Sequence, residues 1–250
     1  MAIYFISDLH LEPAQKAITD GFLSFLDSLE HDKGSVNNAE ELYILGDFFE
    51  VWIGDDYSNE YIELINNALQ KCANKGTKIY FMHGNRDFLV GKTWCDKAHC
   101  ELLEESKLIT LGKDSILLMH GDSLCTDDTE YMKVRFLLRN EQFQAQLLSK
   151  PIPERLEFAK KIRSESKESQ KGKSYEIMDV NQEAVDKALS AANCATMIHG
   201  HTHRPNIHHW EFEGENRTRY VLGDWGSKGW FIKWQAGEEL KLESFDLSLT

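Results

Sequence analysis

The chain has 250 residues, of which 42% are hydrophobic and 11% aromatic, and its formal net charge is −13. This length and composition fit one large globular domain, 1–250, rather than a disordered or repetitive chain. The acidic balance argues against a nucleic-acid partner, because phosphate backbones attract basic surfaces. No apolar run approaches the ~18 residues that a membrane-spanning helix needs.

The predicted elements begin as an alternation of apolar strands and amphipathic helices, which favours an α/β fold with helices packed outside mixed β-sheets. Pro13 is expected in the first turn of the first helix, and Gly76 should end the second. The tail reads as short hairpin or meander strands. Strands are expected at 2–7, 41–47, 78–85, 115–122, 195–201, 207–213, 218–225, 229–235 and 240–246, and helices at 13–30, 59–76 and 180–193. Between about 126 and 170 the pattern is purely helical, with a break at 150–154.

Five of these apolar strands end in side chains that can bind a metal ion. In an open α/β sheet the functional crevice lies beyond the carboxyl ends of the strands, so these side chains should converge. Any one of them could be a turn or surface residue, but the same chemistry at five strand ends argues against coincidence. They are Asp8, His10, Asp47, Asn85, His120, His199, His201 and His203. So many nitrogen and oxygen ligands exceed one tetrahedral zinc site and suit two bridged ions such as Mn²⁺.

The order D-x-H, G-D-x-x-(D/E), G-N-x-D, H-G-D, G-H-x-H resembles the calcineurin-like metallophosphoesterase superfamily. The resemblance implies a sandwich of two mixed β-sheets flanked by helices, with two Mn²⁺ ions at the sheet edges. One ion would be held by Asp8, His10, Asp47 and His201. The other would share Asp47 and take Asn85, His120 and His199, which leaves His203 outside the coordination shell in a supporting or substrate-binding role.

Arg86 departs from the superfamily, in which a histidine usually occupies this position and assists a poor leaving group. Arginine does not donate a proton at neutral pH, but its planar guanidinium can hold a phosphate through two hydrogen bonds. This exchange suits a leaving group that already carries its negative charge well, such as one released from a pyrophosphate. The substrate is therefore expected to be a diphosphate rather than a simple phosphomonoester or a cyclic nucleotide.

Four stretches, at 44–56, 84–91, 120–128 and 177–181, resemble the UDP-2,3-diacylglucosamine hydrolase family of lipid A biosynthesis. The resemblance runs nearly end to end. It implies hydrolysis of UDP-2,3-diacylglucosamine at the α-phosphorus, giving UMP and 2,3-diacylglucosamine 1-phosphate. The implied catalytic residues are Asp8, His10, Asp47, Asn85, Arg86 and His120. The implied substrate contacts are Asn85, Arg86, Asp128, Ser166, Gln170, Lys173 and His199.

The helical stretch 126–170 is expected to be an insertion within the domain. From 131 to 173 the chain has eleven Lys and Arg against five Asp and Glu, together with many apolar residues. The stretch either closes a small core of its own beneath a solvated basic face, or forms a lid with an apolar lining for two acyl chains and a basic rim. The lid would suit a cytoplasmic protein held peripherally on the anionic inner membrane of a Gram-negative bacterium, without an obligate protein partner.

Two other functions remain open. A dinuclear metallophosphoesterase acting on a soluble dinucleotide or nucleoside diphosphate derivative would need the same ligands but not the apolar and basic insertion. A scaffold with this fold that has lost catalysis would be expected to lack ligands, and this sequence has them all. The N-terminal segment has no basic leader and the five cysteines have no regular spacing, so we expect reduced thiols and a cytoplasmic location.

Overall fold

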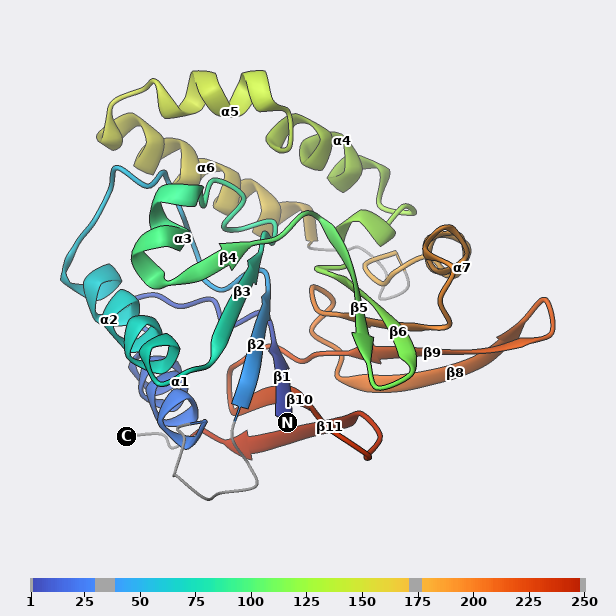
Figure 1. Ribbon diagram of the computed structural model, residues 1–250. Coiled ribbons are helices and arrows are strands. Elements are labelled where there is room, and N and C mark those ends of the chain that lie inside the picture. The colour runs from blue at the N-terminus through green and yellow to red at the C-terminus, as the bar shows by residue number, and fades with distance from the viewer. Residues whose placement is uncertain (1, 30–38, 171–176, 248–250) are drawn as a thin grey trace.

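The computed structural model describes residues 2–29, 39–170 and 177–247, with the backbone alone for 166–170. They form two β-sheets with helices outside them (Figure 1). The strands are β1 Ala2–Ile6, β2 Ala39–Leu45, β3 Lys78–Met82, β4 Cys100–Leu102, β5 Ser106–Leu111, β6 Asp114–Met119, β7 Thr196–His199, β8 Asn206–Phe212, β9 Glu215–Val221, β10 Lys228–Gln235 and β11 Lys241–Asp246. The helices are α1 Lys16–Ser28, α2 Glu60–Asn74, α3 Lys92–Ala98, α4 Thr129–Leu138, α5 Glu141–Leu148, α6 Ile152–Gln170 and α7 Gln182–Ala192.

Both sheets are mixed, as the sequence predicted. The six-stranded sheet has the order β11-β10-β1-β2-β3-β4, in which β1 to β4 are parallel, β10 pairs antiparallel with β1, and β11 pairs antiparallel with β10. The five-stranded sheet has the order β5-β6-β7-β9-β8, with β6, β7 and β9 parallel and an antiparallel strand at each edge. The parallel strands that carry the predicted ligands therefore end at the same side of the molecule.

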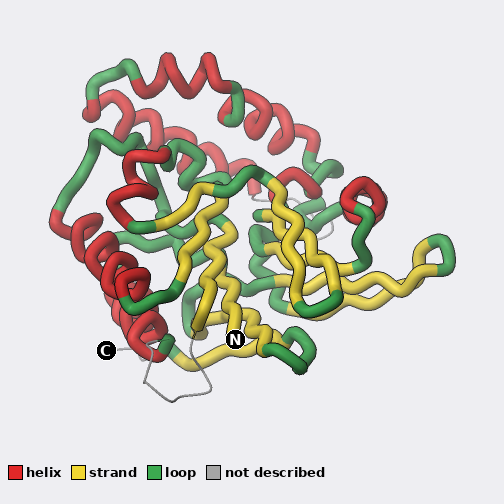
Figure 2. Tube along the Cα trace, viewed as in Figure 1, coloured by secondary structure: helices red, strands yellow, loops and turns green. Residues whose placement is uncertain are grey.

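Strict alternation along β1 shows how the layers pack. Ile3 and Phe5 belong to the core between the two sheets, whereas Tyr4 and Ile6 belong to the core beneath α1, α2 and α3. Successive strand residues point to opposite faces, so a strand covered on both faces is apolar throughout. A third, smaller core lies between the five-stranded sheet and α7 (Figure 2). The result is a four-layer sandwich with helices on both outer faces.

Helices α4, α5 and α6 lie across the end of the sandwich where the parallel strands finish, and we call them the helical cap (Figure 1). The break between α5 and α6 lies at the predicted place, beside Pro151. A second break separates α4 from α5 at Asn140, whose side chain accepts a hydrogen bond from Phe143 N at 3.0 Å. No described helix is long and apolar enough to cross a membrane.

Some local predictions were wrong or incomplete. Helix α1 begins at Lys16, so Pro13 lies in a turn before the helix rather than in its first turn. Helix α3 and the short strands β4 and β5 were not predicted. The start of α3 depends on a distant residue, since the Asp55 carboxylate accepts hydrogen bonds from Gly91 N and Trp94 N at 2.9 and 2.8 Å. Gly76, with a φ of +110°, does follow the end of α2 as expected.

Candidate metal centre

The predicted ligands follow β1, β2, β3, β6 and β7, and the backbone at several of them is unusual. Five non-glycine residues here have positive φ, between 49° and 67°: Asp8, His10, Asp47, His201 and His203. Such conformations cost energy in L-residues and gather at functional sites, where the surroundings hold them in place. Two hydrogen bonds join the loop after β1 to the loop after β2: Asp8 N donates to Gly46 O at 3.0 Å, and His10 N donates to Asp47 O at 2.9 Å.

One group of ligands consists of Asp8, His10 and His203. The Nε2 atoms of the two histidines lie 3.2 Å apart, and His203 Nε2 is 3.4 Å from Asp8 Oδ1. Among the described residues, no hydrogen bond reaches Asp8 Oδ1, although the atom is buried. Two ring nitrogens and a carboxylate oxygen that receives no hydrogen bond from the described part of the chain lie close together, and such a donor set suits a cation.

A second group consists of Asp8, Asp47 and His120, with Asn85 and His201 beside it. Asn85 Oδ1 lies 3.2 Å from His120 Nε2 and 2.9 Å from His201 Nδ1. Asp47 lies between the two groups, with Oδ2 3.9 Å from His10 Nε2 and Oδ1 3.7 Å from His120 Nε2. The structure thus places Asp47 where a bridging carboxylate would be needed.

The structure does not bring His199 to either group, which corrects the ligand set expected from the sequence. His199 is fully buried, its Nδ1 lies 2.8 Å from Gly200 O, and its Nε2 lies 3.1 Å from Arg219 Nη1. A guanidinium beside Nε2 would repel a metal ion. The chain turns after Gly200, and it is His201 and His203 that face the other ligands. The motif G-H-x-H, taken literally from Gly200, was the signal that could have identified this pair.

The charges of these groups suit a cation site. Burial, reinforced by the positive charge of Arg219, lowers the pKa of His199 to about 3, and burial lowers the pKa of His201 to about 4. Both rings are therefore neutral at pH 7. Burial opposes the charged form of His203, but the Asp8 carboxylate overrides it and raises the pKa of His203 to about 9. The carboxylates therefore favour positive charge at the first group.

A cavity of about 290 Å³ runs from Asn85 and Arg86 along the underside of the helical cap. Arg86 N donates to Asp47 Oδ1 at 2.8 Å, while its buried Nε has no partner among the described residues. The cap contributes an apolar lining that includes Leu138, Leu147, Phe158 and Ile162. Asp128 caps α4 through Tyr131 N at 3.0 Å and also lines the cavity.

The remaining predicted contacts cannot be placed in this cavity. The side chains of Ser166 and Gln170, and the whole of Lys173, lie outside the described residues.

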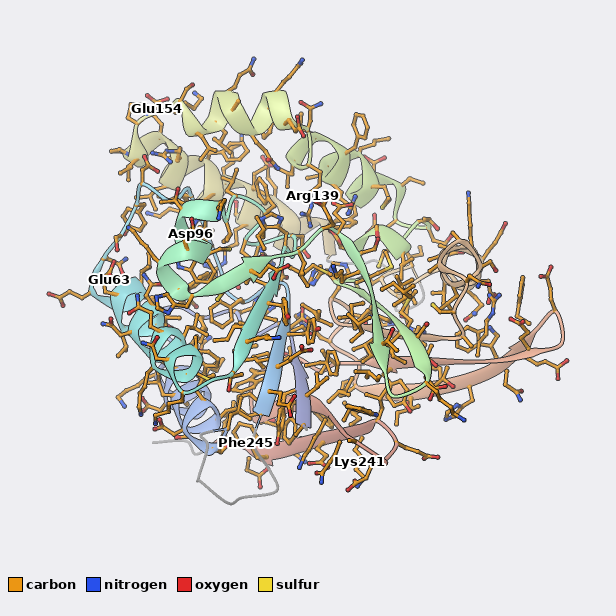
Figure 3. All side chains as sticks on the ribbon, in the orientation of Figure 1. Glu63, Asp96, Arg139, Glu154, Lys241 and Phe245 are labelled. Carbon is orange, nitrogen blue, oxygen red and sulfur yellow. The ribbon has the colours of Figure 1, made fainter. Side chains whose placement is uncertain are left out.

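Sequence reasoning missed several residues that shape the site. The Tyr131 ring lies 5.6 Å from the His201 ring, and its hydroxyl lies 3.3 Å from Asp122 Oδ2. Arg139, labelled in Figure 3, donates from Nη2 to Gly84 O at 3.1 Å and so holds the loop that carries Asn85. No local pattern in the sequence indicates this role, because the acceptor lies 55 residues away.

Comparison with known proteins gives concordant results. The model of the family described as calcineurin-like phosphoesterase matches residues 1–205. A relative from Chromohalobacter salexigens, named UDP-2,3-diacylglucosamine hydrolase, is 45% identical over 98% of this chain and 98% of its own. Relatives with the same name from Pseudomonas putida and Pseudomonas aeruginosa are 47% and 46% identical, over 92% and 93% of this chain and 94% and 95% of theirs.

Proposed function

The chain belongs to the calcineurin-like phosphoesterases and, among them, to the UDP-2,3-diacylglucosamine hydrolases, and we propose that it hydrolyses UDP-2,3-diacylglucosamine at the α-phosphorus to UMP and 2,3-diacylglucosamine 1-phosphate. The observation that carries this substrate is the cavity, which joins Arg86 to an apolar lining. A diphosphate with acyl chains would use both parts of this cavity: Arg86 for the phosphates and the apolar lining for the acyl chains. A soluble dinucleotide would leave the apolar end without a ligand.

The direct test is release of UMP by the purified protein, stripped of metal and supplied with Mn²⁺. We expect rapid release from UDP-2,3-diacylglucosamine and slow cleavage of a diadenosine polyphosphate. Preference for the dinucleotide would contradict the proposed substrate and favour the soluble alternative.

The donor set fits two Mn²⁺ ions, because it combines carboxylate, imidazole and amide oxygen donors and leaves the buried Asp8 Oδ1 without a hydrogen bond from any described residue. Asp8, His10, Asp47 and His203 would hold one ion. Asp47, Asn85, His120 and His201 would hold the other. When bound, such a pair of ions polarises phosphate oxygens and makes water a nucleophile at neutral pH.

The chain's own residues then have distinct tasks. The seven ligands named above would hold the ions, and one of them, Asn85, also faces the cavity. The Arg86 guanidinium holds the substrate phosphates and neutralises charge that develops on the leaving phosphate, without donating a proton. The helical cap covers the reacting groups and keeps water from the acyl chains.

His203→Ala should leave about one Mn²⁺ ion per chain and lower turnover by about 100-fold or more, since loss of even an outer-shell partner costs a metal site about 10- to 100-fold. His199→Gln is the matched control from the same motif and should keep two ions, because His199 faces Arg219 instead. Metal analysis after dialysis measures both variants. Loss of an ion from His199→Gln but not from His203→Ala would restore the ligand set expected from the sequence.

We further propose that residues 126–170 act as a lid insertion whose lining receives the acyl chains. Leu147→Ser should raise KM for the diacylated substrate by about tenfold or more, because each buried methylene contributes ~0.8 kcal/mol. The KM for a deacylated analogue should change little. Leu148→Ser is the matched control, since Leu147 is 4% exposed in the cavity and Leu148 is 40% exposed. If KM of Leu147→Ser rose equally for both substrates, the segment would have only a structural role.

The same cap is proposed to rest on the anionic cytoplasmic face of the inner membrane of a Gram-negative bacterium. Phe136 and Leu137 on α4 are 78% and 48% exposed, close in the helix to Lys133. Apolar side chains that insert and basic ones that attract anionic lipid, at ~1 kcal/mol each, together favour such docking.

Phe136→Ser should weaken sedimentation with phosphatidylglycerol vesicles several-fold, and added salt should weaken it further. Leu64→Ser, which removes an exposed apolar side chain (45%) from α2, away from the helical cap, should not change it. If neither Phe136→Ser nor added salt changed sedimentation with the vesicles, the proposed docking surface would be wrong.

A further inference from the structure

Glu50 connects the candidate metal centre to the helical cap. It follows Asp47 in the loop after β2 and is only 8% exposed. Its Oε2 lies 2.8 Å from His10 Nδ1, and its Oε1 lies 2.5 Å from Arg163 Nε on α6. Both contacts are ion pairs by distance, without hydrogen-bond geometry. One carboxylate thus touches a predicted metal ligand on one side and the cap on the other.

The contact on the His10 side determines which ring nitrogen can bind a metal. With Nδ1 turned toward Glu50, Nε2 is left facing Asp8, Asp47 and His203. Partners on the far nitrogen of a ligating histidine fix its tautomer and ring orientation. An orienting carboxylate works best when its own position is fixed.

The contact on the cap side supplies that fixed position. Arg163 lines the cavity from α6 and also lies 3.6 Å from Glu12. When Arg163 holds Glu50, the carboxylate has already lost its rotamer freedom, so His10 need not order it on binding a metal. By linkage, a metal that orders His10 and Glu50 should hold α6 more firmly.

We propose that Glu50 is a positioning residue through which metal binding at His10 and docking of α6 stabilise each other. This rests on the dinuclear centre of the proposed function. Simple charge repulsion makes the opposite prediction, because removing the positive charge of Arg163 should then tighten binding of a cation nearby. The sign of the effect therefore separates the two explanations.

The test titrates metal-free protein with Mn²⁺ alone and follows free Mn²⁺ by electron paramagnetic resonance. Glu50→Gln should weaken the tighter phase about 10- to 100-fold, and Arg163→Gln should weaken it about fivefold or more. In the Glu50→Gln background, Arg163→Gln should add nothing further. Arg155→Gln is the matched control: Arg155 anchors the same helix through Ile53 O at 2.7 Å and through Asp56, but it touches no predicted ligand.

Hydrogen exchange gives a second measurement of the coupling that does not require substitution of an arginine. Mn²⁺ should slow hydrogen exchange of the backbone amides at 155–165 in the unaltered protein but not in Glu50→Gln. Unchanged or tighter Mn²⁺ binding by Arg163→Gln overturns the coupling, as does an equal loss in Arg155→Gln, which would reflect general loosening of the cap. If the unaltered protein binds no Mn²⁺, the metal centre of the proposed function fails instead.

Discussion

Asp47→Ala should abolish turnover while the fold persists. Asp47 is 2% exposed, and its side chain lies between both ligand groups, 3.9 Å from His10 Nε2 and 3.7 Å from His120 Nε2. Two divalent ions about 3.5–4 Å apart repel each other strongly unless an anion lies between them. The variant should also release Arg86, whose backbone N–H loses its acceptor.

Asp47→Asn makes the same test at constant size, because it keeps the shape of the side chain and removes its charge. We expect both variants to bind fewer than two Mn²⁺ ions and to release UMP at least about 10³-fold more slowly, a loss of about 4 kcal/mol of transition-state stabilisation. Metal analysis, UMP release and thermal unfolding together separate loss of the ions from loss of the fold. Two retained ions with turnover within about tenfold of normal would contradict the bridging role.

The edge of the fold that carries the site was predictable because its signal is local. An apolar run followed by a metal-binding side chain is visible in the sequence at each of five strand ends, and parallel topology then places those ends together. Apart from the motif G-H-x-H, no local pattern chooses among His199, His201 and His203. The choice depends on the turn after Gly200, where His201 adopts a φ of +67°, and on Arg219, which reaches His199 from β9.

The helices of the insertion were predictable from the sequence, but the direction in which each apolar side chain faces was not. The apolar residues of α4 occur around its whole circumference, so periodicity does not indicate which of them face the cavity. The structure separates the apolar residues of the helical cap: Leu147 lines the cavity, Phe143 packs on Phe158 with ring centroids 5.9 Å apart, and Phe136 is exposed. Likewise, no local pattern shows that β10 pairs with β1, more than 220 residues earlier in the chain.

Arg86→Ala should lower kcat/KM by about 10²- to 10³-fold, the loss seen when one charge-stabilising donor is removed from an active site. The side chain lines the cavity beside Asn85, and its buried Nε donates no hydrogen bond to any described residue. Phosphate oxygens are the acceptors that a planar guanidinium fork fits best. Arg86→Lys should recover little of the loss, because an ammonium group supplies charge without the two parallel hydrogen bonds.

Arg86→His distinguishes charge stabilisation from proton donation. It introduces the histidine that the superfamily resemblance implies at this position, so a reaction limited by protonation of the leaving group should become faster. We expect it to be as slow as Arg86→Ala on the diphosphate, since the leaving phosphate needs its charge neutralised rather than a proton. Kinetics on UDP-2,3-diacylglucosamine, with kcat and KM separated, decide the matter. If Arg86→His matched or exceeded the unaltered protein, the leaving group would need a proton and the role assigned to Arg86 would be lost.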